Sequence, residues 1–200
     1  MLGRRQHCAR CTRPESACIC SWIRPLPGRV ALLVLQHPLV VAHAKGSARL
    51  LHMSVPGSRM VTGESFDAAA LDALLHEGGR TPVLLYPATP GVAPVPVPAL
   101  PPERLRLVAL DGTWRKSRKM LHLNPALQVL PRLPLREMAP SQYRIRRAHA
   151  PGQLSTLEAA CHALAQLEGA PGHARALLES FDNFVQVFEQ QAGRIGANAA

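Results

Sequence analysis

The stretch at residues 105–119, LRLVALDGTWRKSRK, decides the fold that we expect for this chain. It opens with a short apolar run that ends at Asp111, and such a run is typical of a strand buried on both faces of a parallel sheet. Gly112 allows a sharp turn, and Thr113 is suited to cap a helix over residues 114–121. Ligands of open α/β sheets bind outside the carboxyl ends of the strands. The sequence therefore puts a carboxylate, a hydroxyl and an indole where such folds carry out chemistry.

The remaining sequence alternates between strand and helix patterns. Strands are predicted at residues 29–36, 59–63, 81–86 and 105–110, with a short fifth strand at 129–131. Helices are predicted at residues 40–53, from Ser65 to a stop at Gly78, at 114–121, from a capping box at Ser155 to 167, and at 173–190. Residues 89–102 are proline-rich, which indicates an extended loop. This alternation predicts an α/β fold with a mostly parallel sheet and flanking helices. Neither a G-x-G-x-x-G motif after the first strand nor a Walker motif is present, which argues against dinucleotide and P-loop sites.

Composition favours a polyanionic partner. The 200 residues suit one domain, and 23 Lys and Arg against 13 Asp and Glu give a formal net charge of +10. Nucleic acid is favoured over a membrane surface, because the cations are spread along the chain and no basic amphipathic helix stands out. The apolar runs are too short to span a bilayer, and the first ten residues lack the apolar segment of a secretory signal. We therefore expect a cytoplasmic protein.

Four closely spaced cysteines predict a metal site near the start of the chain. Cys8, Cys11, Cys18 and Cys20 form a C-x2-C-x6-C-x-C pattern, which suits a tetrahedral, structural zinc knuckle. Disulfides and redox chemistry are the alternatives, and cytoplasmic cysteine usage argues against both. Cys161 stands apart in a helical pattern and is expected to be a buried small apolar residue. His37, His43 and His52 lack a matching ligand pattern, so we expect surface or capping roles for them.

The motif Asp111-Gly112-Thr113-Trp114 resembles the D-x-T-W signature of the DTW-domain family, the tRNA-uridine aminocarboxypropyltransferases. The cysteine pattern resembles that family's zinc knuckle. Further segments resemble family segments in the expected order: His37-Pro38, KGSARL at 45–50, LYP at 85–87 and LSTLEA at 154–159. The resemblance implies a SPOUT-like fold with a trefoil knot. It divides the chain into a zinc knuckle at 1–24, a catalytic domain at 25–192 and a flexible tail at 193–200.

The resemblance also implies a reaction. The 3-amino-3-carboxypropyl group of S-adenosylmethionine moves to N3 of a tRNA uridine, and methylthioadenosine is released. Asp111 is then either the general base for the N3 proton, a binder of the cofactor's amino group or sulfonium, or only a helix cap. Trp114 either offers its face to adenine, uracil or the sulfonium, or is a core indole. Thr113 and nearby backbone amides are candidates to bind the cofactor carboxylate.

The remaining candidate residues fall into two groups. The cofactor-binding candidates are Leu85, Tyr86, Pro87, Leu110, Gly112, Ser155, Thr156 and Glu158, although for Ser155 and Thr156 a pure capping role is an equal alternative. The RNA-binding candidates are Lys45, Arg49, Arg115, Lys116, Arg118, Lys119, Arg144, Arg146 and Arg147. For the stretch at 143–147 the alternative is a solvated basic segment. Such cations would hold tRNA phosphates and position the substrate.

Two other functions fit the same sequence. One is a SPOUT-like RNA methyltransferase, and the other is a non-catalytic, zinc-dependent RNA-binding module. The expected partner is tRNA, with no membrane and no obligate protein partner. The sequence leaves the acceptor uridine and the oligomeric state open.

Overall fold

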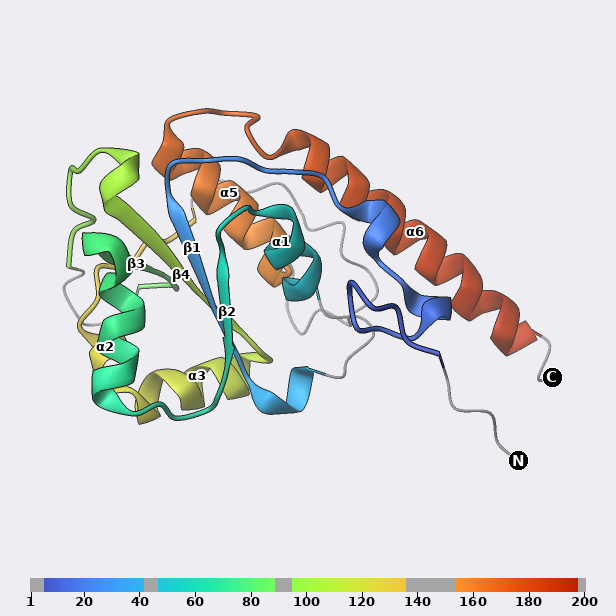
Figure 1. The fold of residues 1–200 in the computed structure, drawn as a ribbon, viewed down its shortest axis with the longest axis horizontal. Helices are drawn as coiled ribbons and strands as arrows, with labels where there is room; N and C mark the ends of the chain where they lie inside the picture. Colours follow the sequence, from blue (N-terminus) through green and yellow to red (C-terminus); the bar gives the residue numbers. More distant parts are fainter. Residues whose placement is uncertain (1–5, 42–46, 89–94, 136–153, 198–200) are drawn as a thin grey trace.

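A four-stranded parallel sheet forms the centre of the protein. The computed structural model describes residues 6–41, 47–88, 95–135 and 154–197, with side chains up to residue 190. The strands are β1 (Ala31–Gln36), β2 (Arg59–Thr62), β3 (Thr81–Leu85) and β4 (Leu105–Asp111). They lie in the order β2-β1-β4-β3, and each neighbouring pair is parallel (Figure 1). The prediction of an α/β fold with a mostly parallel sheet is confirmed.

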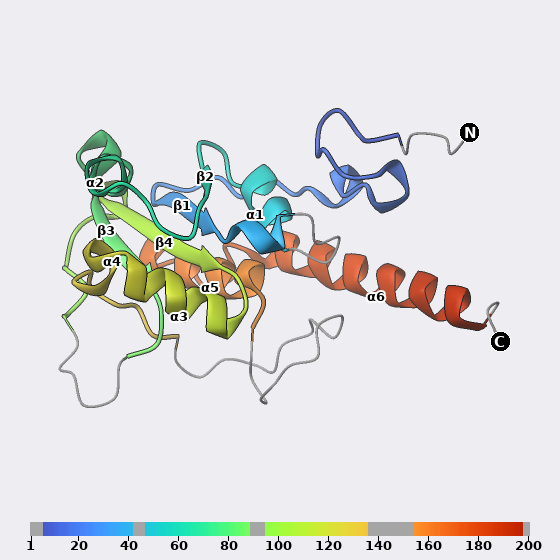
Figure 2. The same ribbon diagram turned by 90° about the horizontal axis from the view of Figure 1, so that it is seen from below.

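Helices cover both faces of this sheet (Figure 2). One face carries α1 (Ala48–Ser54), α5 (Thr156–Glu168) and α6 (Arg175–Ala197), and the other carries α2 (Ala68–His76), α3 (Trp114–Leu123) and α4 (Pro125–Gln128). Short 3-10 turns lie between them: η1 (Glu15–Ala17), η2 (Cys20–Trp22), η3 (Pro38–Val40), η4 (Glu77–Gly79) and η5 (Pro102–Arg104). In the part of the chain that the structure describes, no helix is long and apolar enough to cross a bilayer.

The strand sequences explain the two-sided core. Along β1, Leu32 and Val34 pack with α1, α5 and α6, whereas Leu33 and Leu35 pack with α2, α3 and α4. Side chains alternate between the faces of a strand, so a continuous apolar run is what a sheet covered on both sides requires. The central strand β4 is buried along nearly its whole length.

Most helix ends follow the predicted capping residues. The Thr113 side chain accepts a hydrogen bond from the Lys116 N–H at the start of α3. Ser155 and Glu158 form the reciprocal capping box at the start of α5. Several boundaries differ from the prediction by one to three residues, and two helix ends differ in a way that has a clear description. Helix α2 begins at Ala68, because Asp67 rather than Ser65 is its N-cap, and α6 continues beyond residue 190 to Ala197.

The predicted fifth strand at residues 129–131 is wrong. That segment follows α4 and makes a single parallel bridge, between Leu84 and Arg132. The Leu84 N–H donates to the carbonyl of Pro131, and the Leu133 N–H donates back to the carbonyl of Leu84. The amide of residue 131 is the one that would continue the ladder toward residue 129, and Pro131 has no N–H to donate. The predicted helix at 40–53 is replaced by η3 and α1, and residues 42–46 lie outside the described residues.

The N-terminal segment packs on α1 and α6 and belongs to the same core. Cys11 and Ile19 are almost fully buried in the cluster that includes α6. The Trp22 and Phe184 rings meet edge to face at 6.2 Å, and the Ser180 hydroxyl donates to the Trp22 carbonyl at 2.8 Å. Figure 1 shows this segment running alongside α6. The N-terminal segment is therefore held to the rest of the protein by side-chain contacts as well as by its covalent connection to β1.

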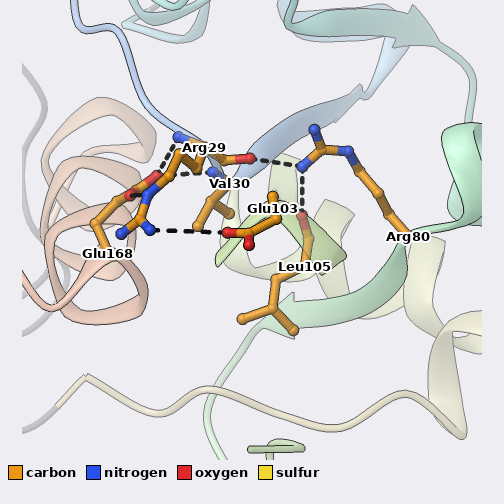
Figure 3. A network of polar contacts seen from close by, with 6 residues as sticks. All are labelled: Arg29, Val30, Arg80, Glu103, Leu105 and Glu168. Carbon is orange, nitrogen blue, oxygen red and sulfur yellow. Dashed lines mark hydrogen bonds and ion pairs between the residues drawn. The ribbon is translucent and has the colours of Figure 1, made fainter. Parts of the chain in front are cut away.

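A carboxylate at the end of α5 fixes the start of β1. Glu168 accepts hydrogen bonds from the backbone N–H of Arg29 and of Val30 and from the Arg29 guanidinium (Figure 3). Arg80, at the start of β3, donates to the carbonyls of Arg29 and Leu105. These contacts join the amino ends of β1, β4 and β3. The candidate site lies at the other end of the sheet, where the strands finish.

Candidate functional site

Asp111 lies at the carboxyl end of β4 and is almost completely buried. Its side-chain environment comes from two other elements, because Gln36 is its partner in the β1–β4 register and Thr156 begins α5. The Gln36 amide donates to Oδ2 at 2.8 Å, and the Thr156 hydroxyl donates to Oδ1 at 2.8 Å. Only 4% of Asp111 is exposed. Both carboxylate oxygens therefore act as acceptors inside the protein. The position of Asp111 at the end of a strand predicts an accessible side chain, but the side chain is shielded from solvent.

Gly112 permits a close approach of two turns. A Cβ at residue 112 would lie 3.2 Å from Cβ of Lys116 and 3.6 Å from Cβ of His37. The His37 N–H donates to the Asp111 carbonyl at 2.9 Å, which continues the β1–β4 pairing by one residue. The D-x-T-W turn and the His-Pro turn are therefore adjacent, although they are far apart in sequence.

The LSTLEA segment meets the same edge of the sheet. Ser155 and Glu158 are buried, and their side chains are engaged in the capping box. The Leu157 N–H donates to the Ser47 hydroxyl at 3.3 Å, so α5 also contacts the residue that precedes α1. Ser155 thus has the capping role that was one of its two alternatives, whereas the Thr156 hydroxyl is bound to Asp111.

An aromatic pair stands beside the Asp111 turn. The rings of Trp114 and Tyr86 meet at 5.7 Å with an interplanar angle of 77°, and the Arg132 guanidinium lies 5.5 Å from the centre of the Tyr86 ring. Arg132 also donates to the carbonyl of Pro87 at 3.2 Å. Trp114 is 45% exposed, so it is not a core indole. The LYP and D-x-T-W segments therefore form one surface with an accessible aromatic side chain.

A buried histidine network was not predicted from the sequence. His37 Nε2 and Glu64 Oε1 are 2.7 Å apart, and Lys119 Nζ lies 2.8 Å from Glu64 Oε2. The Leu39 N–H donates to His37 Nδ1, so Nε2 is the nitrogen that carries the proton and donates to Glu64. The Lys119 ammonium, and then His37, lower the pKa of Glu64. His37 does cap η3 as expected, but it is buried against a carboxylate that sequence spacing did not reveal.

Asn124 holds the same network from the end of α3. Its amide nitrogen donates to the carbonyls of Met120 and Glu64, and its amide oxygen accepts from the Phe66 N–H. The side chain is almost completely buried. This arrangement fixes the loop between β2 and α2, which carries Glu64, against α3.

The four knuckle cysteines converge as a metal site requires. Their sulfur atoms all lie within 4.8 Å of one another, and the Cys8–Cys20 and Cys11–Cys18 sulfur pairs are each 3.7 Å apart. A tetrahedral site with Zn–S bonds of about 2.3 Å separates its sulfurs by about 3.8 Å. The thiols are free, and a disulfide would bring sulfurs to about 2.05 Å. The backbone N–H groups of Cys11 and Arg10 lower the pKa of Cys8 to about 6, whereas burial and the neighbouring sulfurs raise the pKa of Cys20 to about 12.

The predicted RNA-binding cations are only partly brought together. Arg115, Arg118 and Lys119 are exposed on α3, beside Trp114, and Lys119 is also the partner of Glu64. Arg49 lies elsewhere and donates to the Thr12 hydroxyl of the knuckle at 3.1 Å. Four further candidates, Lys45, Arg144, Arg146 and Arg147, lie outside the described residues.

Comparison with known proteins gives a consistent set of relatives. A family model described as the DTW domain matches residues 5–189. The chain is 33% identical over 175 residues to the tRNA-uridine aminocarboxypropyltransferase 2 of Drosophila melanogaster, which covers 84% of this chain and 69% of that protein. It is 28% identical over 176 residues to the mouse (Mus musculus) protein of the same name, which covers 82% of this chain and 57% of that protein.

A plant relative is more distant. The tRNA-uridine aminocarboxypropyltransferase A of Arabidopsis thaliana is 25% identical over 140 residues, which covers 59% of this chain and 51% of that protein. The chain thus spans little more than half the length of its mouse and plant relatives. No solved structure matches it.

Proposed function

Since this chain belongs to the DTW-domain family, we propose that it transfers the 3-amino-3-carboxypropyl group of S-adenosylmethionine to N3 of a tRNA uridine. The names of its fly and mouse relatives describe those proteins as tRNA-uridine aminocarboxypropyltransferases, and the family resemblance supplies the S-adenosylmethionine donor and the N3 position. The observation that carries the proposal is the meeting of the D-x-T-W turn with the first residue of α5 at the carboxyl ends of β1 and β4. Parallel α/β folds bind their ligands at this edge.

The residues at this edge suit S-adenosylmethionine. The exposed indole of Trp114 offers a π face, which attracts a sulfonium and also stacks on adenine or uracil. Thr113 and the first N–H groups of α3 suit the cofactor's carboxylate, because a helix start favours anions. The half-buried strand ends Leu85 and Leu110 supply apolar walls. When bound, the cofactor supplies the electrophilic carbon to which the uridine nitrogen is joined.

The protein must remove the N3 proton of the uridine. N3–H is a weak acid, and the nitrogen becomes nucleophilic only when the proton leaves, which is the task of a general base. Asp111 is the carboxylate at the centre of this edge, and we propose that its charge drives the deprotonation. Its burial keeps water away from the carboxylate and strengthens its electrostatic effect on neighbouring groups.

The tRNA would bind along α3. Its exposed cations lie directly beside Trp114, so phosphates held there would place an unstacked base near the indole. The cysteine cluster would hold structural zinc, since its four ligands leave no open coordination position for catalysis. We also propose the SPOUT-like knot and the division at residue 24, which are implied by the family resemblance. The division implied at residue 192 falls inside α6, which continues to Ala197.

Nucleoside mass spectrometry tests this function. The purified protein is incubated with S-adenosylmethionine and unmodified tRNA, and the tRNA is digested to nucleosides. We expect 3-(3-amino-3-carboxypropyl)uridine and methylthioadenosine in equal amounts, and at least a 100-fold loss, on the order of a full general-base contribution, in Asp111→Asn. N3-methyluridine with adenosylhomocysteine would instead identify a methyltransferase. Binding of tRNA without any nucleoside product would identify a non-catalytic RNA-binding module.

A further inference from the structure

We propose that Thr156 is the catalytic residue that takes the N3 proton of the target uridine, and that Asp111 receives the Thr156 proton in the same step. This inference rests on the function proposed above and assigns the base within it. In the sequence Thr156 was a candidate for binding the cofactor or for capping α5. The geometry gives it a different place, between the buried carboxylate and the surface.

Asp111 and Thr156 differ in how far they are buried. Asp111 is 4% exposed, whereas Thr156 is partly exposed at the first position of α5. Both of the Asp111 oxygens already accept a hydrogen bond within the protein. A large substrate such as tRNA therefore meets the Thr156 hydroxyl before it meets the carboxylate.

The hydrogen bond between Thr156 and Asp111 has a fixed direction. A threonine hydroxyl has one proton and two acceptor lone pairs, and the Thr156 proton is given to Asp111 Oδ1 at 2.8 Å. The lone pairs that remain can only accept. Uridine presents N3–H as a donor, whereas the N3 of cytidine is an acceptor, so this hydroxyl favours uridine over cytidine. The buried carboxylate thus makes the hydroxyl an acceptor toward the substrate, and this role gives the hydroxyl its preference for uridine.

The proton and electron balance is complete without another reactant. The N3 proton passes to Thr156 Oγ1 while the Oγ1 proton passes to Asp111 Oδ1, so no free alkoxide forms. The N3 electron pair forms the bond to the γ-carbon of the aminocarboxypropyl group. The bond from that carbon to sulfur breaks, and its electrons remain on the sulfur of methylthioadenosine. Oδ1 then becomes the donor in the hydrogen bond to Thr156.

Gln36 is the positioning residue behind this pair. Its amide donates to Oδ2, so the carboxylate is held from both sides and Oδ1 keeps facing Thr156. Gln36 is the register partner of Asp111 across the β1–β4 pair, so the sheet fixes the backbone positions of both residues.

The test compares variants that differ by one hydroxyl. Thr156→Val keeps the branched shape and removes the hydroxyl, and Thr156→Ser restores it. We expect kcat to fall by about 100-fold or more in Thr156→Val and to stay within about tenfold of wild type in Thr156→Ser. Binding of S-adenosylmethionine by calorimetry should stay within about threefold in both. Thr81→Val is the same change at the amino end of β3, away from the candidate site. It is the control and should keep full activity.

A more acidic acceptor provides a second readout. The tRNA is transcribed with 5-fluorouridine, whose electron-withdrawing fluorine makes N3–H easier to remove. A defect in proton transfer should shrink on this tRNA, so the ratio of wild-type to Thr156→Val rates should fall by about tenfold. A defect that is only structural would give the same ratio on both tRNAs.

Each outcome decides between the two proposals. Equal rates in wild type and Thr156→Val, loss of cofactor binding in Thr156→Val, or an unchanged rate ratio on 5-fluorouridine tRNA would overturn the role of Thr156 and leave the reaction standing. Loss of the native fold in both Thr156→Val and Thr156→Ala would also overturn it, because Thr156 would then be structural. No transfer by the wild-type protein would contradict the reaction itself, and the inference would fall with it.

Discussion

Trp114 is a large aromatic side chain that the fold leaves close to half exposed. Its described ring contact is the edge-to-face pair with Tyr86, and such a pair contributes about 1 kcal/mol. We expect Trp114→Ala to lower the free energy of unfolding by only about that amount in urea titrations, and to weaken binding of S-adenosylmethionine or tRNA by at least tenfold because a stacking face is lost. Trp22→Ala is the matched control.

The Trp22 control should give the opposite pattern. Trp22 packs against Phe184 and accepts a hydrogen bond from Ser180 through its carbonyl. Truncation there should cost about 3 kcal/mol of stability and leave ligand binding in the folded fraction unchanged. If Trp114→Ala were the more destabilising of the two, Trp114 would be a packing residue.

Single residues also show where sequence reasoning succeeds and fails. The D-x-T-W turn was predictable, because a buried strand, a glycine and a capping threonine are adjacent in sequence. The partners of Asp111 were not, because Gln36 lies 75 positions earlier and Thr156 lies 45 positions later. Glu64 was missed for the same reason: it comes from a loop after β2, and only the register of the sheet places it beside His37.

Helix α3 carries the exposed cations that we expect to contact tRNA. Replacing Arg115 and Arg118 together by alanine should weaken tRNA binding by similar factors for different tRNAs. It should also reduce the slope of log K against log salt by about 2, since each phosphate contact contributes about 1. Fluorescence anisotropy over a salt series measures both effects.

Arg104→Ala and Arg175→Ala provide the control for this experiment. Both residues are exposed and lie away from the carboxyl ends of the strands. An equal change of slope in these variants would mean that tRNA binding follows net charge and not the α3 surface.

Helix α5 stabilises the sheet through Glu168, and this contribution depends on pH. Burial opposes ionisation of Glu168, but the N–H groups of Val30 and Arg29 and the Arg29 guanidinium outweigh burial and lower its pKa. A pKa that is lower in the folded state stabilises the fold fully above the unfolded value of about 4.3, and the stabilisation is lost as pH falls through the folded pKa. We expect Glu168→Gln to cost about 1–2 kcal/mol at pH 7, and the difference from wild type to shrink below about pH 4.

Urea titrations from pH 3 to pH 7 measure this difference. Glu103 also faces Arg29, at 3.7 Å, but it is largely exposed. Glu103→Gln should therefore give no resolved change at any pH. A Glu168→Gln difference that persists unchanged at pH 3 would exclude ionisation as its source.

Elements with a strong local pattern were predicted well, and those set by distant contacts were not. The capping box made α5 predictable from six letters of sequence. The segment at 129–131 has the composition of a strand, yet Pro131 has no N–H to donate, and the chain there makes one bridge with β3, at Arg132. A sequence pattern reveals the apolar face of a helix and the residue that caps it. Strand pairing depends instead on which backbone N–H groups are free to donate to a neighbouring strand.

At the scale of the whole molecule, the cysteine cluster should determine stability far from itself. Cys11 and Ile19 share a core with α1, α5 and α6, and Arg49 joins α1 to Thr12. We expect zinc in a 1:1 ratio by elemental analysis, and we expect Cys8→Ser or a chelator to lower Tm by about 10 °C or more. Because the core is shared, the single unfolding transition should shift as a whole.

A separate transition would contradict this picture. If chelation left the main Tm unchanged and added a small transition at low temperature, the cysteine segment would be an independent unit. Cys161→Ser, at a buried thiol outside the cluster, tests whether any loss of a cysteine has the same effect. It should lower stability without changing the zinc content.

The order of the strands also determines when the protein acquires its structure during synthesis. The middle of the sheet joins residues 31–36 to residues 106–111, and the strand that β3 pairs with is β4. A nascent chain that has emerged only as far as residue 100 can pair β1 with β2 and nothing more. Contacts between such distant segments form slowly, so an arrested chain of that length should remain protease-sensitive. The candidate site would assemble only after β4 and the start of α5 have emerged, because it needs both.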